Sequence, residues 1–281
     1  MQTAIALLLA LASTTLTNIA YLREHDAAAK LPVLSMRRPL HSAHALLGDR
    51  SWMLGFAMES GGFLFYAAAL ALASLALVQS VAAGGIGVLA FASARFARRR
   101  LTRRELSGVL LSVLGLAALG ISLIGGASKG EGGTTSEILL WLGLTAAVAL
   151  VLLVVGRRLN QVAIAYGLAG GLFFSIGDIS TKVATEGGAR TAFVVGLIVG
   201  YTLGTALLQI GYQAGAALTV AGLATLLTNA VPIAAGTIAL HEPVPGGVLG
   251  GLRVLAFGAV TAGAVLLARP AKPSEASVGP T

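Results

Sequence analysis

Three ionisable side chains lie inside long apolar stretches of this sequence, where a charge is costly. Glu59 stands in the segment AMESGGFLFY, and Asp178 and Lys182 stand near the end of AIAYGLAGGLFFSIGDISTKV. Ionisable residues within a membrane usually face a partner or water, and many of them line ion or proton pathways. Glu59 is therefore a candidate for binding an ion or a proton, and the alternative is a structural bond to a neighbouring helix.

Asp178 and Lys182 are four residues apart, so they share one face of a helix. Either they neutralise each other near the membrane surface, or Asp178 lines a substrate path while Lys182 has a structural role. The same stretch holds four glycines, Gly167, Gly170, Gly171 and Gly177. Glycines of this kind permit either close packing of helices or local unwinding.

Other polar side chains lie within or beside the apolar stretches. The candidates for a substrate or ion path are Asn18, Tyr66, Gln79, Gln209, Tyr212 and Asn229. Groups of this kind also bond one helix to another, so each alone is weak evidence for a site. Pro232 follows Asn229 by three residues and predicts either a broken helix with exposed backbone or a plain kink.

Arg253 lies inside the last apolar stretch and Glu242 lies just before it. We expect Arg253 to extend its long side chain outward to the membrane surface. The alternative is a charge pair with Glu59, Asp178 or Glu242.

The composition requires these side chains to be positioned by membrane helices. Of 281 residues, 56% are hydrophobic and only 11% are charged, and the mean hydropathy is +0.88. Soluble domains average about 25% charged residues. The apolar runs are continuous rather than alternating, which predicts an all-α integral membrane protein and not a barrel. The net charge of +8 fits basic cytoplasmic loops better than nucleic-acid binding, and the absence of cysteine excludes disulfides and thiolate chemistry.

About nine membrane-spanning helices can be drawn. We place them at residues 2–21, 52–76, 79–96, 105–125, 138–156, 162–183, 192–217, 220–239 and 246–268. Spans one to four and six to nine have similar layouts, and Asn18-Ile19 matches Asp178-Ile179 in position. Since the two sets are displaced by five spans, an odd number, they are predicted to be inverted repeats.

The predicted organisation has four parts. Residues 1–125 form a first repeat with a cytoplasmic loop at 22–51, residues 126–161 an external linker and a joining helix, residues 162–268 a second repeat, and residues 269–281 a cytoplasmic tail. Nine spans put most of the 19 Lys and Arg on one side, which predicts an external N-terminus and a cytoplasmic C-terminus. Met1-Gln2-Thr3 lacks a basic side chain, which favours a retained first helix over a cleaved signal peptide. The run ARRRLTRRE at 97–105 is a topology signal or a contact for anionic lipid headgroups.

Short motifs resemble those of a known family. They are Arg157-Arg158-Leu159-Asn160-Gln161 before a glycine-rich helix that ends at Lys182, Gln209-Ile210-Gly211-Tyr212, ALHE ending at Glu242, and Ala73-Ser74-Leu75 followed by Val78-Gln79. Over about residues 50–125 and 138–268 the sequence resembles the drug/metabolite transporter (EamA-like) superfamily, and within it the NIPA-type magnesium transporter-like branch. The sequence departs from the family at Ser80, where proline is usual. It also departs at Arg98–Arg100, which stand where the family has an acidic residue in its first half, the counterpart of Glu242 in the second half.

The resemblance implies a plasma-membrane transporter that moves a small organic solute or cation by alternating access, with Glu59 and Asp178 lining the path. The alternatives are a NIPA-like magnesium transporter, in which these two acids would hold the transported Mg²⁺, and a non-transporting subunit that docks a partner or anionic lipid. We expect no enzyme activity, no cofactor and no nucleic-acid partner. The expected partners are the lipid bilayer and a small solute or cation, and glycine-rich helix faces would allow a homodimer.

Overall fold

In the computed structural model, the described residues are 2–73, 75–82, 85–96, 101–122, 133–242 and 246–268. Every regular element in these ranges is helical, which confirms the predicted all-helical class. The elements are α1 (Gln2–Ala28), α2 (Pro39–Gly48), α3 (Arg50–Leu72), α4 (Leu75–Ala82), α5 (Gly85–Phe96), α6 (Arg103–Ser122), α7 (Thr135–Arg158), α8 (Val162–Ala184), the 3-10 helix η1 (Gly188–Phe193), α9 (Val194–Ala214), α10 (Ala217–Ile238) and α11 (Gly247–Ala268).

Six helical segments of the described chain are long and apolar enough to cross a bilayer. They are α1, α3, α7, α8, η1 with α9, and α10. The count of nine spans and the inverted repeat stay predictions. Parts of the predicted arginine run (97–100), the external linker (126–132) and the tail (269–281) lie outside the described residues.

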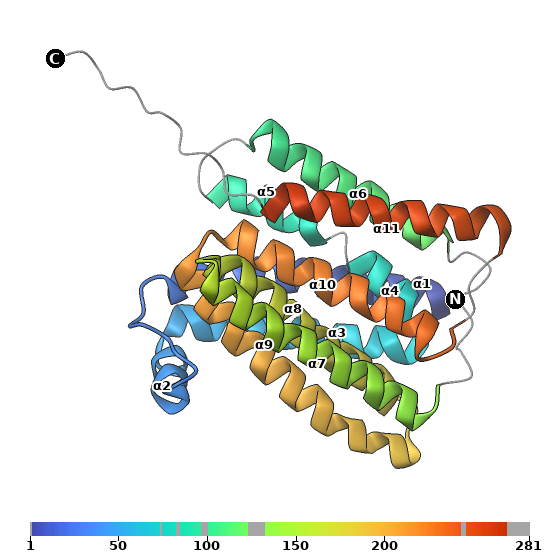
Figure 1. Cartoon of the computed structure of the whole chain (residues 1–281), viewed down its shortest axis with the longest axis horizontal. Coiled ribbons are helices and arrows are strands. Elements are labelled where there is room, and N and C mark those ends of the chain that lie inside the picture. The colour runs from blue at the N-terminus through green and yellow to red at the C-terminus, as the bar shows by residue number, and fades with distance from the viewer. Residues whose placement is uncertain are drawn as a thin grey trace.

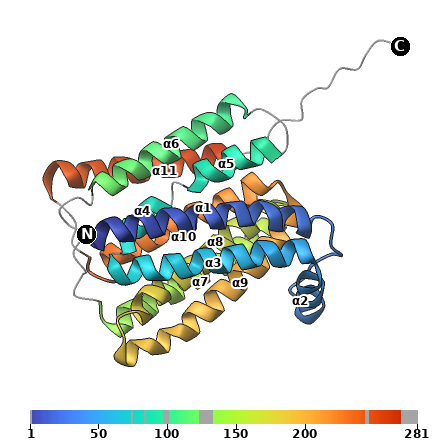
Figure 2. The same cartoon turned by 180° about the vertical axis from the view of Figure 1, so that it is seen from behind.

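The helices form a main bundle with a second layer beside it (Figure 1). Helices α5, α6 and α11 make the second layer, in which α6 packs along α11. In the main bundle α1 packs along α3, and α8 packs along α9 (Figure 2). Helix α10 contacts α8 as well as α4, and so joins the early and late parts of the chain.

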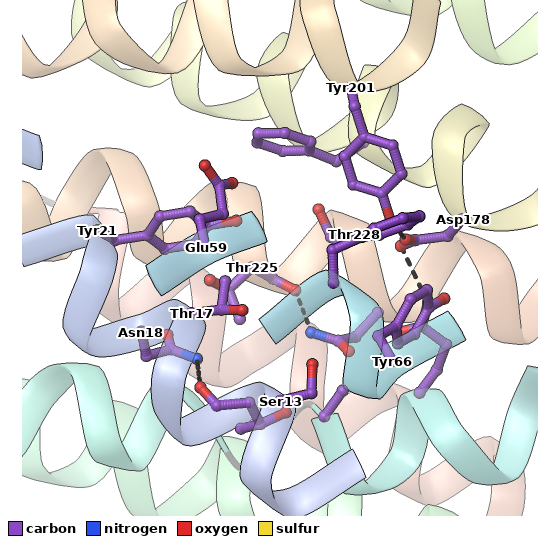
Figure 3. Close-up of a pocket in the computed structure, with 16 residues that line it drawn as sticks. Ser13, Thr17, Asn18, Tyr21, Glu59, Tyr66, Asp178, Tyr201, Thr225 and Thr228 are labelled. Carbon is purple, nitrogen blue, oxygen red and sulfur yellow. Dashed lines mark hydrogen bonds between the residues drawn. The ribbon is translucent and has the colours of Figure 1, made fainter. Parts of the chain in front are cut away.

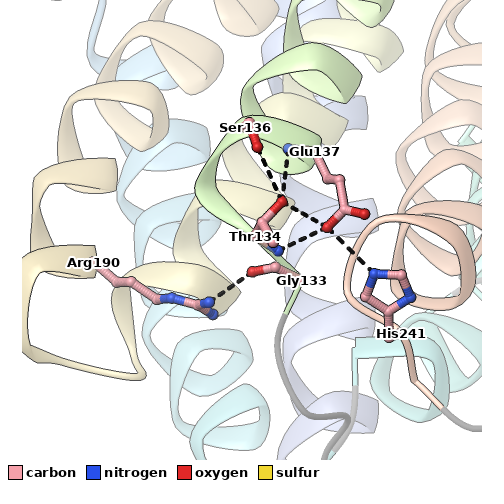
Figure 4. Close-up of polar contacts among 6 residues, drawn as sticks. All are labelled: Gly133, Thr134, Ser136, Glu137, Arg190 and His241. Carbon is pink, nitrogen blue, oxygen red and sulfur yellow. Dashed lines mark hydrogen bonds and ion pairs between the residues drawn. The ribbon is translucent and has the colours of Figure 1, made fainter.

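The two ends of the bundle differ in charge. One end, which we call the basic end, carries Arg23, Arg50, Arg157 and Arg158, where α1 and α7 end and α3 begins. At the opposite end, Thr134 and Glu137 cap the start of α7 with reciprocal hydrogen bonds (Figure 4). Arg190 Nη2 donates to the carbonyl of Gly133 at 2.7 Å, and His241 lies 3.3 Å from Glu137. These bonds connect the starts of α7 and α9 and the end of α10.

Helix α1 continues beyond its predicted end at residue 21. It reaches Ala28 because no proline or glycine interrupts it before Pro32. Glu24, expected in a cytoplasmic loop, therefore lies within the helix and is fully buried. The predicted loop at 22–51 begins correspondingly later and contains the short helix α2.

The predicted third span at 79–96 is two helices, α4 and α5, and the chain breaks between α3 and α4 instead of at residues 76–79. Ala73 is extended, with φ −140° and ψ 171°. Lys182 Nζ donates to the carbonyls of Leu70 and Ala73 at 3.2 and 3.0 Å, and the N–H of Leu75 donates to Glu242 Oε1 at 2.9 Å. A cation at the end of α3 and a carboxylate at the start of α4 each complement the helix dipole. The break is thus stabilised by α8 and by the segment after α10.

Helix α8 forms the centre of the bundle, and it is unbroken. Its glycines serve close packing and not local unwinding, because a Cβ on Gly171 would lie 2.6 Å from the carbonyl oxygen of Ala224 in α10. On the face of α8 toward α9, a Cβ on Gly200 would likewise lie 2.5 Å from the backbone nitrogen of Gly177. Helix α7, by contrast, exposes large apolar side chains along its length, among them Leu140 and Val151, as a lipid-facing helix does.

Candidate functional site

A cavity of about 80 Å³ lies inside the main bundle (Figure 3). Its walls come from α1, α3, α4, α8, α9 and α10, and most of its lining side chains carry a hydroxyl, amide or carboxyl group. Six of the eight predicted path residues line it, namely Asn18, Glu59, Tyr66, Gln79, Asp178 and Asn229. The other two, Gln209 and Tyr212, are buried outside it near the basic end. The structure thus brings together residues far apart in sequence, whose transport role stays a prediction.

Asp178 is held by donors from two other helices. It is 2% exposed, and its two oxygens accept from Tyr201 OH at 2.5 Å and from Gln79 Nε2 at 3.0 Å. Gln79 Nε2 also donates to Tyr66 OH at 2.6 Å. Lys182, four residues further on, donates to the end of α3. Of the two interpretations offered for this pair, the geometry therefore fits a cavity-lining Asp178 and a structural Lys182.

Two asparagines present acceptor oxygens at the cavity. Asn18 Nδ2 donates to the carbonyl of Thr14 at 2.8 Å, and Asn229 Nδ2 donates to the carbonyl of Thr225 at 2.5 Å. Both amide oxygens are buried and have no hydrogen-bond partner among the described residues. Buried polar groups are normally paired, so each of these oxygens is suited to accept from a hydrogen-bond donor or to bind a cation.

Helix α10 runs through Pro232 without interruption, so the predicted broken helix is wrong. Proline has no N–H, so the carbonyl four residues earlier, at Thr228, loses its usual helical donor. Thr228 lines the cavity beside Asn229. Its hydroxyl donates to the carbonyl of Gly171 at 3.3 Å.

Glu59 lies toward the basic end of the cavity, and it has a neighbour that sequence reasoning missed. The carboxyl groups of Glu24 and Glu59 interact, and Glu24 packs on Gly55, one turn before Glu59. Glu24 Oε2 accepts from Gln209 Nε2 at 2.5 Å. The signal that could have found Glu24 is its place three residues after Tyr21, on the polar face of a helix without a breaking residue.

Arg253 does not extend outward, contrary to our expectation. It is 6% exposed, and its Nη2 donates to Thr237 Oγ1 at 2.5 Å. Of the acids considered as partners, Glu242 is the one whose charge acts on Arg253. Burial against α10 gives the guanidinium protein partners, so it has no need to reach the membrane surface.

Comparison with known proteins finds a distant relative. The "Probable magnesium transporter NIPA9" of Arabidopsis thaliana is 28% identical over an alignment of 269 residues, and the match covers 84% of this chain and 74% of the relative. No family model matches the chain, and no solved structure matches it. The relative and the long apolar helices together support a multi-pass membrane transporter.

Proposed function

We propose that this protein carries a divalent cation, with Mg²⁺ as the first candidate, through the central cavity. The observation that carries the proposal is the lining: Glu59 and Asp178 supply carboxylates, and Asn18 and Asn229 supply buried oxygens that lack donors among the described residues. Mg²⁺ prefers oxygen ligands and keeps several waters, so one or two carboxylates suffice. The relative described as a probable magnesium transporter supports the same assignment.

The size of the cavity favours an ion over a large solute. One water needs roughly 10–15 Å³ of such space, so about 80 Å³ holds a few waters or a partly hydrated ion. A cavity lined by polar side chains also argues against a non-transporting subunit, whose centre would be packed and dry.

Alternating access is the expected mechanism. Asp178 accepts one hydrogen bond at each oxygen, from Tyr201 and from Gln79, and these donors compete with a cation for the carboxylate. Gln79 belongs to the short helix α4, and a small movement of α4 would release Asp178 toward the cavity. Rocking of the two predicted repeats would then open each side in turn.

A small organic cation is the second candidate. An apolar groove between α3 and α9 contains Phe56, Leu197 and Thr205 and shares Glu59 and Tyr201 with the cavity. It offers an aromatic route to Glu59 for a lipophilic cation. Such a solute would require the cavity to widen.

Flux into proteoliposomes tests the proposal. We expect wild-type vesicles to take up Mg²⁺, and Asp178→Asn to lose at least about tenfold of the rate, because the variant keeps the shape of the side chain and removes its charge. The control is Glu186→Gln, which changes a carboxylate outside the cavity. Folded wild-type protein that admits an organic cation but no Mg²⁺ would replace the first candidate with the second.

A further inference from the structure

A second polar cluster lies between the cavity and the basic end, where α1, α3 and α9 meet. It comprises Glu24, Glu59, Gln209 and Tyr212. Glu24 and Gln209 are fully buried, and Tyr212 is 2% exposed. The Gln209 amide donates to Glu24, which fixes the two side chains against each other.

Each member of the cluster has one buried oxygen that finds no partner within the described part of the chain. These atoms are Glu24 Oε1, Glu59 Oε2, Gln209 Oε1 and Tyr212 OH. Buried polar atoms are rarely left unpaired, because each costs the free energy of its lost hydration. Carboxylate and amide oxygens belong to the donor set of a hard cation, and the phenol oxygen can bind the cation through one of the waters that Mg²⁺ keeps.

The charges in the cluster require a counter-ion or protons. The titratable group that acts on Glu24 is Glu59 on α3, and Glu24 in turn acts on the phenols of Tyr21 and Tyr212. Among the described residues, no ion pair joins a lysine or arginine to Glu24 or Glu59. One divalent cation would balance both carboxyls.

The neighbours of Glu24 in the chain do not supply this charge. Arg23 is exposed, and His25 packs its ring edge-to-face on Tyr212 with 5.4 Å between centroids. The His25 Nδ1 lies 3.2 Å from Asp26 and not beside Glu24.

We infer that Glu24, Glu59, Gln209 and Tyr212 bind a divalent cation, at a site distinct from Asp178. The role of this site in transport rests on the proposed function, whereas the binding of a cation at the site does not. Glu59 belongs to both places, because it lines the cavity and interacts with Glu24. Along α1 the lining residues end at Tyr21, and Glu24 follows about 4.5 Å further along the helix axis. The site therefore continues the path from the cavity toward the basic end.

No three His, Cys, Asp or Glu side chains converge in the described ranges. The cation would therefore keep several waters, as Mg²⁺ commonly does.

Calorimetric titration of the full chain in nanodiscs with MgCl₂ tests the site. We expect Glu24→Gln to weaken Mg²⁺ binding by about tenfold or more, because one of two charged ligands is lost. Asp26→Asn is the matched control, since it removes an exposed carboxylate two residues away on the same helix, and it should leave binding unchanged. Equal Mg²⁺ binding by Glu24→Gln and by the wild type would overturn the inference. That result is expected if the two carboxyls simply share a proton.

Two further variants keep the outcome interpretable. If Glu24→Gln does not fold, Tyr212→Phe removes a single uncharged oxygen, and a smaller loss of Mg²⁺ affinity, of about two- to fivefold, is expected without a change in elution profile. Asp178→Asn should lose flux while it keeps Mg²⁺ binding at the Glu24 site. Glu24-dependent binding without any wild-type flux would refute the proposed function and leave the site standing.

Discussion

The Gln79 side chain connects helix α4 to two other residues that line the cavity. Its single amide nitrogen donates to both Asp178 and Tyr66, so one side chain on α4 orients groups on α8 and α3. Such buried bonds between membrane helices contribute about 0.6 kcal/mol on average, too little to explain a fully buried glutamine by stability alone. Orientation of Asp178 is the better explanation.

Replacement of Gln79 should therefore affect ion binding more than stability. We expect Gln79→Leu to raise the apparent KM for Mg²⁺ several-fold, while the thermal midpoint shifts by only a few degrees. The control is Gln161→Leu, an exposed amide at the start of α8. Flux at varied Mg²⁺ concentration measures the effect, and an unchanged KM would show that Gln79 does not orient Asp178.

At the scale of the elements, the break between α3 and α4 depends on residues more than 100 positions away in sequence. Lys182 and Glu242 bind its two sides. Local sequence therefore predicted that a turn must occur in the long run at 52–96 but put it at 76–79. Glu59 and Asp178 were recognisable because a charge in an apolar run is a local signal. Glu24 lay past the predicted end of its helix and close to basic residues, so that signal was hidden.

Removal of the Lys182 ammonium should loosen the break. Lys182→Met leaves the carbonyls of Leu70 and Ala73 without this donor, and we expect a loss of about 1–3 kcal/mol of stability. Lys182→Arg, which keeps a cationic donor, should recover part of it. Thermal unfolding in detergent measures both, with Arg158→Met as the exposed control. Equal stability of the Met and Arg variants would contradict this role.

The close crossing of α8 and α9 leads to a prediction about stability. A Cβ on Gly200 would lie 2.5 Å from the backbone nitrogen of Gly177 and 2.8 Å from the carbonyl oxygen of Phe173, neither of which can move aside cheaply. Gly200→Ala should cost about 1–3 kcal/mol by overpacking. Gly143→Ala on α7, where no described atom lies within 4 Å, should be neutral or slightly stabilising. Unfolding midpoints that change alike would refute the packing argument.

For the whole molecule, the distribution of basic residues predicts which end faces the cytoplasm. The sequence contains no cysteine, so single cysteines report sidedness without background. With an impermeant maleimide on intact cells, we expect Glu186→Cys to be labelled and Arg38→Cys to be labelled only after permeabilisation. The reverse pattern would invert the predicted topology but leave the cavity and its chemistry unaffected.

The cavity draws its walls from both ends of the chain, and this has a consequence for biosynthesis. Glu59 emerges from the ribosome roughly 150 residues before Gln209, and Glu24 emerges earlier still, so the delay is at least about 8–30 s at 5–20 residues per second. Until α9 arrives, Glu24 lacks the amide donor that Gln209 provides, and α8 and α10 are not yet present to enclose the two acids. The pair must therefore stay hydrated or protonated, beside the insertion machinery, until the second half of the chain encloses it.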